Sequence, residues 1–330
     1  MTRMGRMELL VPKDREGRFQ TELFDRYQRN EKALMLSLVE MYVHGVSTRK
    51  VKAVTEALCG PDISKSQVSR LAKDLDEEVR IWRHRPIRKP YPYLVVDARY
   101  EKVRINHQVK SQGVLLVVGV GEDGYREMPG TWVADSESEA SWSEVFKELR
   151  DRGLHGVRYV VSDDHAGLVK AIGQYFQGCL WQRCQVHFLR NLIAQVGRKD
   201  RPRIIEMMRE VTAAQGYESA RKRMDEVIET LENTHPKVAQ MIEDHGEEIL
   251  SVYQLPCVHR RSMKSTNMLE RYNQELKRRT RVVRIFPHQE SCLRPVTAMA
   301  MEMTEEWMGR RYLIFEDEVS IQTTNNQMAA

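Results

Sequence analysis

Cysteine is scarce in this sequence, and its number is odd. The chain has five cysteines among 330 residues, and they are scattered rather than grouped. A disulfide framework needs an even set of cysteines at regular spacings, as in small secreted domains. The pattern therefore indicates reduced thiols and a cytoplasmic protein. The five are Cys59, Cys179, Cys184, Cys257 and Cys292.

Long apolar runs are also missing. No uninterrupted apolar stretch approaches the roughly 18 residues that are needed to cross a bilayer. Residues 1–17 carry charges without the continuous apolar segment of a secretory signal. Internal repeats and low-complexity tracts are absent as well. Hydrophobic residues make up 41% of the chain and charged residues 30%, which is typical of a soluble globular protein and excludes a disordered one.

The excess of one charge sign is small. There are 52 basic and 47 acidic residues, a net charge of +5 and a pI near 8.9, which alone is weak support for a polyanionic partner. The basic residues are grouped in three stretches, each of which could be an ordinary solvated face. Because the stretches flank candidate acidic residues, they favour a phosphate-binding surface. They contain Arg80, Arg83, Arg85, Arg88 and Lys89, then Arg260, Arg261 and Lys264, and then Lys277, Arg278, Arg279, Arg281 and Arg284.

The N-terminal part of the chain changes from an extended to a helical pattern. Residues 1–30 are predicted to be an extended or β-rich lead-in, and residues 31–90 a helical domain that ends in a basic, proline-containing linker. The third predicted helix begins with polar residues of the kind that helix-turn-helix proteins present to the major groove. A helix-turn-helix-like DNA-binding domain is one interpretation, and an ordinary three-helix bundle is the other. The candidate DNA contacts are Ser64, Lys65, Ser66, Gln67 and Arg70.

A block of strand signals follows over residues 91–187. Three strands joined by tight turns come first, and then helix, strand, helix and strand alternate. This order predicts an RNase H-like α/β fold, with a mixed five-stranded sheet flanked by helices. In that fold the first and fourth strands are neighbours, so Asp97 and Asp163 at their ends are expected to meet. The strands are expected at 94–96, 103–107, 113–120, 158–161 and 180–184, and the helices at 136–152 and 166–176.

The character of the chain changes again over residues 188–261, which are charged and helical in pattern and carry no clear strand signal. We interpret this segment as an all-helical insertion, with residues 91–187 as the first part of a catalytic core. Residues 262–330 complete the core and add C-terminal helices. A long helix is predicted over Asn267–Arg279, and a final one from about Glu290 to Arg311.

Asp97, Asp163 and Glu270 could together hold divalent metal ions. Phosphoryl transfer needs an activated oxygen nucleophile and neutralisation of the leaving oxygen, and two divalent ions about 4 Å apart supply both. Mg²⁺ prefers carboxylate oxygens and keeps several waters. Each residue also has a structural interpretation. Asp97 could be a turn residue, either Asp163 or Asp164 could cap a helix, and Glu270 could complete a capping box with Asn267.

The helix predicted over Asn267–Arg279 arranges side chains on two neighbouring stripes. The apolar stripe is suited to packing on a sheet, and the polar stripe presents a carboxylate, an amide and a cation together, as a metal and phosphate site requires. Arginines at the helix end could hold DNA phosphates. The apolar stripe is Leu269, Tyr272 and Leu276, the polar one is Glu270, Asn273 and Lys277, and the arginines are Arg278, Arg279 and Arg281.

Four separated strings resemble, in order and wording, those of the mutator-type bacterial insertion-sequence transposases. They are YPYLVVDARYEKVR, YVVSDDHAGLVKAI, WQRCQVHFLRN and STNMLERYNQELKRRTRVVRIFP, and the likeness runs from about Gly5 to Tyr312. The resemblance implies a catalytic triad of Asp97, Asp163 and Glu270, and an RNase H-like fold with a helical insertion before the helix that bears the glutamate. A further N-terminal DNA-binding segment of the family is expected to be missing here.

The resemblance also implies a C-x-x-H signature, formed here by Cys184 and His187. Such a pair lacks the second pair of ligands that a structural zinc site needs. Packing near the active site, or handling of a base or phosphate, explains the two residues better than zinc does.

From the resemblance we expect a DNA transposase that holds two Mg²⁺ ions, or Mn²⁺ in their place. Water would cut the ends of the element to expose a 3′-OH, which would then attack target DNA. The expected partners are double-stranded DNA, as terminal inverted repeats and as target, and a second copy in a homodimer. No membrane is expected as a partner, and a nucleoid-associated cytoplasmic protein follows. A circular copied intermediate is favoured over simple excision.

Two other functions are compatible with the residues. The first is an RNase H-like nuclease that cuts branched or hybrid nucleic acid without strand transfer. The second is a helix-turn-helix DNA-binding regulator, whose acidic residues would be structural. A regulator has no need of three converging carboxylates, so the acidic residues favour an enzyme.

Overall fold

The computed structural model describes residues 76–315. The predicted lead-in over residues 1–30, the helical domain up to residue 75 and the candidate DNA contacts from Ser64 to Arg70 lie outside the described residues. The described residues form two compact units. One contains residues 76–84, 102–110 and 274–299, and the other contains residues 85–101, 111–273 and 300–315.

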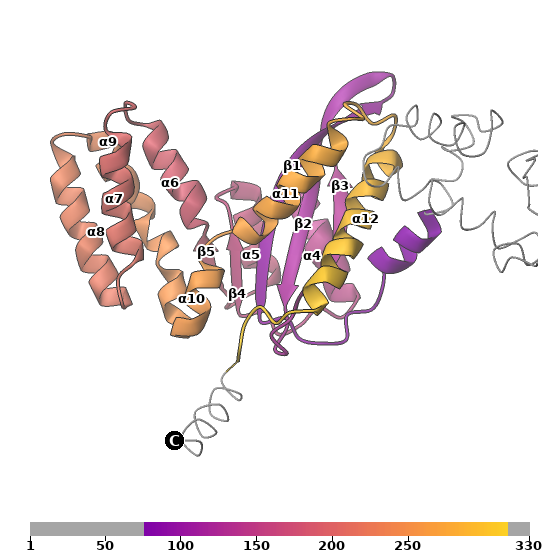
Figure 1. Ribbon diagram of the computed structural model, residues 1–330, viewed down its shortest axis with the longest axis horizontal. Coiled ribbons are helices and arrows are strands. Elements are labelled where there is room, and N and C mark those ends of the chain that lie inside the picture. Colours follow the sequence, from indigo (N-terminus) through magenta and orange to yellow (C-terminus); the bar gives the residue numbers. More distant parts are fainter. Residues whose placement is uncertain (1–75, 316–330) are drawn as a thin grey trace, which may run out of the picture. The chain divides into compact units, whose positions relative to one another are not determined.

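Five strands form one mixed sheet in the order β3-β2-β1-β4-β5 (Figure 1). β1 (Tyr93–Ile105) pairs in parallel with β4 (Tyr159–Ser162), which pairs in parallel with β5 (Leu180–Arg183). β2 (Gln108–Val120) and β3 (Arg126–Ala134) are antiparallel. The mixed five-stranded α/β architecture is therefore confirmed, as is the predicted adjacency of the first and fourth strands.

The strand predictions contain two errors. One strand is predicted as two and another is not predicted, so the predicted number of strands is still five. The segments at 94–96 and 103–107 are not separate strands, because β1 runs through Asp97 to Ile105. Its burial changes from continuous to alternating after Asp97, so one strand looks like two in the sequence. β3 is not predicted at all, since Pro129 and Gly130 break its strand pattern, although its centre is buried.

The turn between β1 and β2 has only two residues. Asn106 and His107 both have positive φ, 48° and 65°. Positive φ at both positions is the signature of a type I′ turn, whose twist matches that of the flanking strands. Asparagine and histidine enter this left-handed region more readily than most residues, which explains how the chain reverses here without glycine.

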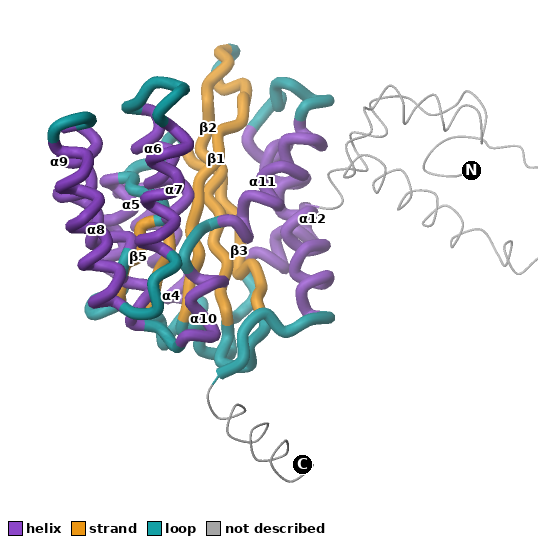
Figure 2. The backbone as a smooth tube through the Cα atoms, turned by 60° about the vertical axis from the view of Figure 1, so that its left-hand side comes forward, coloured by secondary structure: helices purple, strands orange, loops and turns teal. Residues whose placement is uncertain are grey.

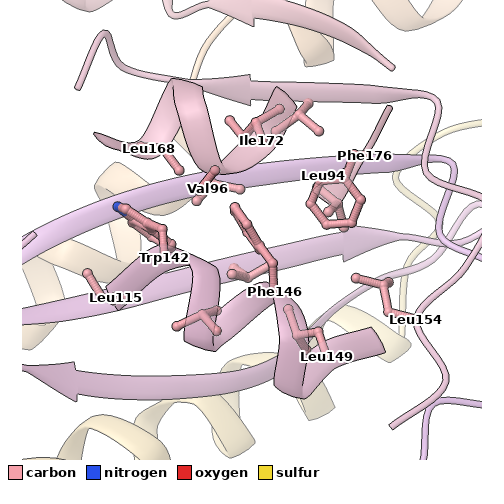
Figure 3. Close-up of a cluster of buried hydrophobic side chains, with 14 of the residues drawn as sticks. Leu94, Val96, Leu115, Trp142, Phe146, Leu149, Leu154, Leu168, Ile172 and Phe176 are labelled. Atoms are coloured by element: carbon pink, nitrogen blue, oxygen red, sulfur yellow. The ribbon is translucent and has the colours of Figure 1, made fainter. Parts of the chain in front are cut away.

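A hydrophobic core lies on one face of the sheet, beneath α4 (Glu139–Asp151) and α5 (Ala166–Tyr175) (Figure 3). Because strand side chains alternate between faces, Leu94 and Val96 of β1 point into this core. α4 contributes an apolar stripe at helical spacing. The stripe consists of Trp142, Val145, Phe146 and Leu149, all of which are buried.

α4 begins where a side chain satisfies its first free backbone groups. The hydroxyl oxygen of Ser138 accepts a hydrogen bond from the Ser141 N–H at 3.2 Å, which is how an N-cap residue fixes a helix start. Within the core, the Phe146 ring lies 5.7 Å from Trp142 and 4.9 Å from Phe176, between centroids. These contacts fix both helices on one face of the sheet and leave the other face for different elements.

From Gln185 to Met263 the structure consists of helices and contains no strand. The first four helices lie side by side next to the sheet (Figure 2), and shorter elements lead back towards it. This helical content agrees with the sequence prediction, although the first helix starts at Gln185 rather than after residue 187. The elements are α6 (Gln185–Ala194), α7 (Arg201–Thr212), α8 (Tyr217–Glu232), α9 (Pro236–His245), η2 (Gly246–Ile249), η3 (Ser251–Gln254) and α10 (Cys257–Met263).

Two long helices complete the described chain. α11 (Asn267–Thr280) and α12 (Gln289–Met308) follow the predicted helices closely. In the unit that contains residues 76–84, the guanidinium of Arg294 in α12 donates to both carboxylate oxygens of Asp76, at 2.7 and 2.9 Å, a bidentate geometry that favours strong binding.

Even α12, with 20 residues, does not cross a membrane, because no helix in residues 76–315 is both long and apolar enough to do so.

The core beneath α4 and α5 predicts a large effect of one truncation. Phe146 is fully buried, so Phe146→Ala removes a ring and leaves a cavity, which is expected to lower the free energy of unfolding by about 3–5 kcal/mol. Urea denaturation followed by circular dichroism measures the change. Met308→Ala is the control, because 64% of Met308 is exposed and the expected change is within about 0.5 kcal/mol. Equal effects of the two substitutions would contradict the packing described.

Candidate active site

The register of the two parallel strands β1 and β4 sets Asp97 level with Asp163. Three residue pairs fix that register, and continuing it by two residues brings Asp97 opposite Asp163, which directly follows β4. Neighbouring strands lie about 4.8 Å apart, so two carboxylates enter one small region of the sheet. The pairs that set the register are Tyr93 with Tyr159, Leu94 with Val160, and Val95 with Val161.

Asp97 points away from the core beneath α4 and α5. It shares the face of Tyr93 and Val95, because Leu94 and Val96 occupy the opposite face. Helix α11 meets β1 there: Asn273 Nδ2 donates to Asp97 Oδ2 at 2.7 Å, and Arg99 Nη1 donates to the Asn273 carbonyl at 2.9 Å. The polar stripe predicted for α11 therefore reaches Asp97 through its amide.

The two aspartates are buried together, and this disfavours their ionised forms. Asp97 is only 6% exposed. Burial and then the negative charge of Asp163 raise the pKa of Asp97 to about 7, whereas the charge of His187 opposes the shift. Burial also raises the pKa of Asp163, again against His187 and His165. Asp163 Oδ1 is buried and accepts no hydrogen bond. Two buried carboxylates with raised pKa values favour the binding of a further cation beside them.

Asp163 and Asp164, which the sequence does not separate, have different surroundings. Asp164 Oδ2 forms an ion pair of 2.8 Å with Arg183, whose buried guanidinium also binds Glu248 at 2.9 Å. Neither aspartate is the N-cap residue of α5, because that position belongs to His165 and no side-chain hydrogen bond caps the helix. Asp164 is thus held by a structural arginine, and Asp163 is the one that faces Asp97.

Glu270 lies on α11 one turn before Asn273 but has a different partner. Its Oε1 accepts from Arg190 Nη2 of α6 at 2.6 Å. Among residues 76–315, no group of three or more His, Cys, Asp or Glu side chains stands close enough together to hold a metal ion. The structure therefore brings Asp97 and Asp163 together, and puts Glu270 on the helix that contacts Asp97, in an ion pair with an arginine.

Cys184 and His187 lie beside these acidic residues. The Cys184 thiol accepts from the backbone N–H and the hydroxyl of Thr266, both at 3.4 Å, and so ties the start of α6 to the residue before α11. Burial acts to raise the pKa of Cys184, but hydrogen bonds with His187 and Thr266 outweigh it and lower that pKa. The bond with Cys184 and the charges of Asp97 and Asp163 raise the pKa of His187. The pair lies near the candidate active site, as the sequence suggested.

Two further residues near the site are missing from the sequence predictions. Arg190 carries a weak signal, since it lies three residues after His187 on the same helix and within one of the family-like strings. Glu137, in the segment between β3 and α4, has none. Burial and then Asp163 raise its pKa, and its own charge contributes to the raised pKa of Asp97. Trp142 Nε1 donates to Glu137 Oε1 at 3.2 Å, which fixes it at the edge of the acidic group.

Several of the basic residues predicted to bind DNA make contacts within the fold. Arg85 Nη2 donates to the Met128 carbonyl at 2.8 Å, and Lys89 Nζ pairs with Asp123 and Glu127 at 2.9 and 3.0 Å. Backbone carbonyls and neighbouring carboxylates occupy others in the same way. These are Arg260 with the carbonyls of Leu255 and Gln215, and Arg278 and Arg279 with Glu275.

Other predicted DNA contacts have no such internal partner. Within residues 76–315, no ion pair or side-chain hydrogen bond engages five of them, and four of the five are exposed. Arg83 is partly buried and takes part in an interaction of its own. The DNA-binding prediction therefore rests on the exposed residues Arg88, Arg261, Lys277 and Arg281 and the partly buried Lys264.

Comparison with known protein families gives one match over most of the chain. The model of the family described as "Transposase, Mutator family" matches residues 1–310. The matched region includes every described residue of the candidate active site.

Curated relatives of the chain are also named as transposases. The chain is 46% identical over 318 residues to the transposase for insertion sequence element ISRM5 of Rhizobium meliloti (strain 1021), covering 96% of this chain and 80% of that protein. It is 41% identical over 320 residues to the transposase for insertion sequence element IS256 in transposon Tn4001 of Staphylococcus aureus, with 96% and 82% coverage. The transposase for IS406 of Burkholderia multivorans (strain ATCC 17616 / 249) is 42% identical over 319 residues, with the same coverages.

The raised pKa of Asp97 predicts a specific pH dependence of stability. Between the ordinary pKa of 3.8 and about 7 the folded chain binds more protons at Asp97 than the unfolded chain does, so stability falls as pH rises through this window. Asp97→Asn removes the buried charge. At about 1.4 kcal/mol per pKa unit, the substitution is expected to raise the free energy of unfolding at pH 8 by about 1–3 kcal/mol without added metal.

Urea denaturation in EDTA at pH 5 and pH 8 measures this effect. The gain should be larger at pH 8 than at pH 5, where Asp97 is mostly protonated. Asp151→Asn, an exposed position at the end of α4, controls for the general change in net charge. A variant that is less stable than wild type at both pH values would rule out a buried, electrostatically strained Asp97.

Proposed function

Because the chain belongs to the Mutator family of transposases, we propose that Asp97, Asp163 and Glu270 form a metal-dependent site with which it cuts and joins DNA. The observation that carries this proposal is the parallel pairing of β1 with β4, which sets Asp97 level with Asp163. Two buried carboxylates with raised pKa values, Asp97 partly through the charge of Asp163, beside a helix with a third carboxylate, are typical of a functional site rather than of a stabilising one.

The strand order supports an RNase H-like core. An antiparallel pair beside β1 and two parallel strands on its other side, with helices between β3, β4 and β5, is the order expected for that fold. The helices from Gln185 to Met263 then interrupt the core before α11, which bears Glu270. This layout matches what the family resemblance implies for the catalytic domain.

The donor set suits Mg²⁺, or Mn²⁺ in its place. Carboxylate oxygens are the ligands that Mg²⁺ prefers, and one or two protein carboxylates with waters suffice. Asp97 and Asp163 would hold the ions. Asp163 Oδ1 accepts no hydrogen bond, so its lone pairs would be available to a metal ion. Glu270 would be the third ligand, on the face of α11 that already meets Asp97 through Asn273. A bound pair of ions activates an oxygen nucleophile and neutralises the leaving oxygen.

The chain's own residues position these groups. Asn273 orients the carboxylate of Asp97 through its 2.7 Å hydrogen bond. Cys184 fixes the residue before α11, and thereby the helix that carries Glu270. His187 contributes positive charge beside both aspartates. These contacts hold the acidic side chains from rigid elements, which is what precise in-line displacement at phosphorus requires.

The proposed reaction has two displacements at phosphorus. In the first, water attacks a phosphodiester at the end of the element, and the bond to the 3′ oxygen breaks to leave a 3′-OH. In the second, that 3′-OH attacks a phosphodiester of the target, and one target strand is joined while another 3′-OH is released. No covalent intermediate with the protein is needed. The terminal inverted repeats would be bound before cutting, and the pairing of two ends favours a homodimer.

The second displacement separates this proposal from a nuclease without strand transfer. Both would cut DNA with the same carboxylates, but only a transposase joins the exposed 3′-OH to new DNA. The Mutator family match favours the transposase, and it disfavours a regulator with merely structural carboxylates.

Substitution of the three carboxylates tests the catalytic assignment. Asp97→Asn, Asp163→Asn and Glu270→Gln are each expected to reduce cleavage at least about 1,000-fold, since loss of a metal ligand removes charge stabilisation at the reacting phosphorus. The substrate is DNA with the repeats that flank the gene, incubated with MgCl₂, and the 3′ ends are mapped. DNA binding in EDTA should remain largely intact.

Two neighbouring carboxylates are matched controls for this experiment. Asp164→Asn changes the residue beside Asp163, and Glu275→Gln changes another glutamate of α11 that pairs with Arg278 and Arg279. Both controls should still cut. Cleavage at the wild-type rate by any one of the three test variants would remove that residue from the proposed site.

Metal binding is expected to stabilise the folded chain independently of DNA. A ligand that binds only the folded state raises stability according to its concentration relative to Kd, and the ions would relieve the repulsion between Asp97 and Asp163. MnCl₂ at pH 8 should therefore raise the unfolding temperature of the wild type in a calorimeter. Asp97→Asn should show at most a small rise, and Asp151→Asn a wild-type rise. Equal rises in all three proteins would argue against a metal site at Asp97.

A further inference from the structure

Helix α6 extends from the candidate active site towards the helices beside the sheet (Figure 1). Its first turn carries His187, which lies within electrostatic reach of Asp97 and Asp163. The next turn carries Arg190, which pairs with Glu270 at 2.6 Å. DNA held for cutting at this site must therefore pass close to the exposed side of α6.

The exposed side of α6 carries no acidic residue. The helix buries Gln185, Phe188 and Leu192, so the opposite side faces solvent with Arg190 and Asn191. Residues 185–205 contain five basic residues and one acidic residue, Asp200, whereas residues 217–245 of α8 and α9 contain four basic and seven acidic residues. The positive charge of this helical region is thus concentrated on the part that leaves the active site.

The turn between α6 and α7 and the first turn of α7 carry four more basic residues. Arg198, Lys199, Arg201 and Arg203 are all exposed, and no ion pair engages any of them among residues 76–315. Asp200 lies between them, but its carboxylate is 3.7 Å from His235. The two arginines of α8 differ, since Arg221 and Arg223 both pair with nearby carboxylates. Unpaired cations beside an acidic catalytic site are suited to phosphate.

The spacing fits a DNA backbone. A helix rises about 1.5 Å per residue, so the part of α6 from Arg190 to its end at Ala194 spans roughly 6 Å, and Arg198 follows in the turn beyond it. Phosphates of one DNA strand advance about 3.4 Å along the helix axis per nucleotide, so the helical part alone covers about two of them. A DNA strand bound at the catalytic site can contact Arg190 and the cations from Arg198 to Arg203 at the same time.

We propose that the exposed side of α6, the α6–α7 turn and the first turn of α7, with Arg190, Arg198, Lys199, Arg201 and Arg203, form a DNA-phosphate-binding surface that leads into the catalytic site. This surface rests on the proposed function and adds a DNA contact that none of the three basic stretches in the sequence includes. Arg190 joins the surface to the site, because the same guanidinium that now binds Glu270 can bind a phosphate once metal ions engage that glutamate.

Paired neutralisations of equal charge test the surface. The test variant is Arg198→Gln with Lys199→Gln, and the control is Lys222→Gln with Lys237→Gln, two exposed lysines of α8 and α9 that are also without ion pairs among the described residues. Both proteins lose two positive charges. Binding of the full chain to a fluorescein-labelled duplex is measured by anisotropy in EDTA over a range of KCl concentrations, with one duplex of the flanking repeats and one of arbitrary sequence.

The test variant is expected to bind both duplexes about tenfold more weakly, and its plot of log K against log[KCl] should lose about 2 units of slope, one for each phosphate contact. The control should keep the wild-type affinity and slope. Arg190→Gln should weaken binding in the same direction. Unfolding temperatures check that all variants fold.

Three outcomes would overturn the surface. The first is a test variant that binds DNA as tightly as the control. The second is equal weakening of binding in the test variant and the control, which would indicate a response to net charge alone. The third is a wild-type chain that binds neither duplex. The binding experiment contains no metal and requires no cleavage. Failure of the catalytic proposal would be seen in a different measurement. Asp97→Asn would still cut DNA, whereas the binding experiment would still give the result expected for the surface.

Discussion

The parallel pairing of β1 with β4 is the constraint on which the site depends. Its register brings Asp97 level with Asp163 from positions 66 residues apart, and backbone hydrogen bonds between the strands hold the two carboxylates close although their charges repel. The apolar core on the other face of the sheet supplies the stability that tolerates this repulsion. A site of buried like charges is costly for folding and useful for binding cations, so the fold carries an electrostatic strain that a bound metal would relieve.

The second constraint is the attachment of α11 to the sheet. Asn273 contacts Asp97, and Thr266, just before α11, contacts Cys184 at the start of α6. Through these two contacts, segments separated by the whole helical region from Gln185 to Met263 meet at one point. An insertion of this size is tolerated because the chain leaves the core at β5 and returns beside it, as the hydrogen bond from the Gln185 N–H to the Lys264 carbonyl, 3.1 Å long, shows. Helix α11 is thus positioned by short-range contacts at the two ends of this helical region.

Much of this could be predicted from the sequence, for identifiable reasons. The apolar runs at Leu94–Val96 and Val160–Val161 mark the two central strands, and the order of strands and helices makes them neighbours. The residue pattern alone does not separate Asp163 from Asp164, and only the family resemblance selects Asp163, because the physical difference lies in Arg183, a charged residue that is buried in β5. Likewise β3 escapes prediction since Pro129 and Gly130 interrupt its strand pattern, and Glu137 escapes because only the folded chain brings it near Asp163.

The basic residues show why charge in a sequence is a poor guide to a nucleic-acid surface. Arg260 and Arg279 belong to dense basic stretches, yet carbonyls of Leu255 and Gln215 take the first guanidinium, and Glu275 takes the second. A cation already paired inside the fold gains little by binding phosphate, since it must first give up its partner. The segment from Arg198 to Arg203, in the α6–α7 turn and the start of α7, is less conspicuous in the sequence, but its four cations are exposed and no ion pair engages them within the described part of the chain. The cations that remain free beside the acidic site are therefore a better guide to the proposed DNA surface than the number of cations in the sequence.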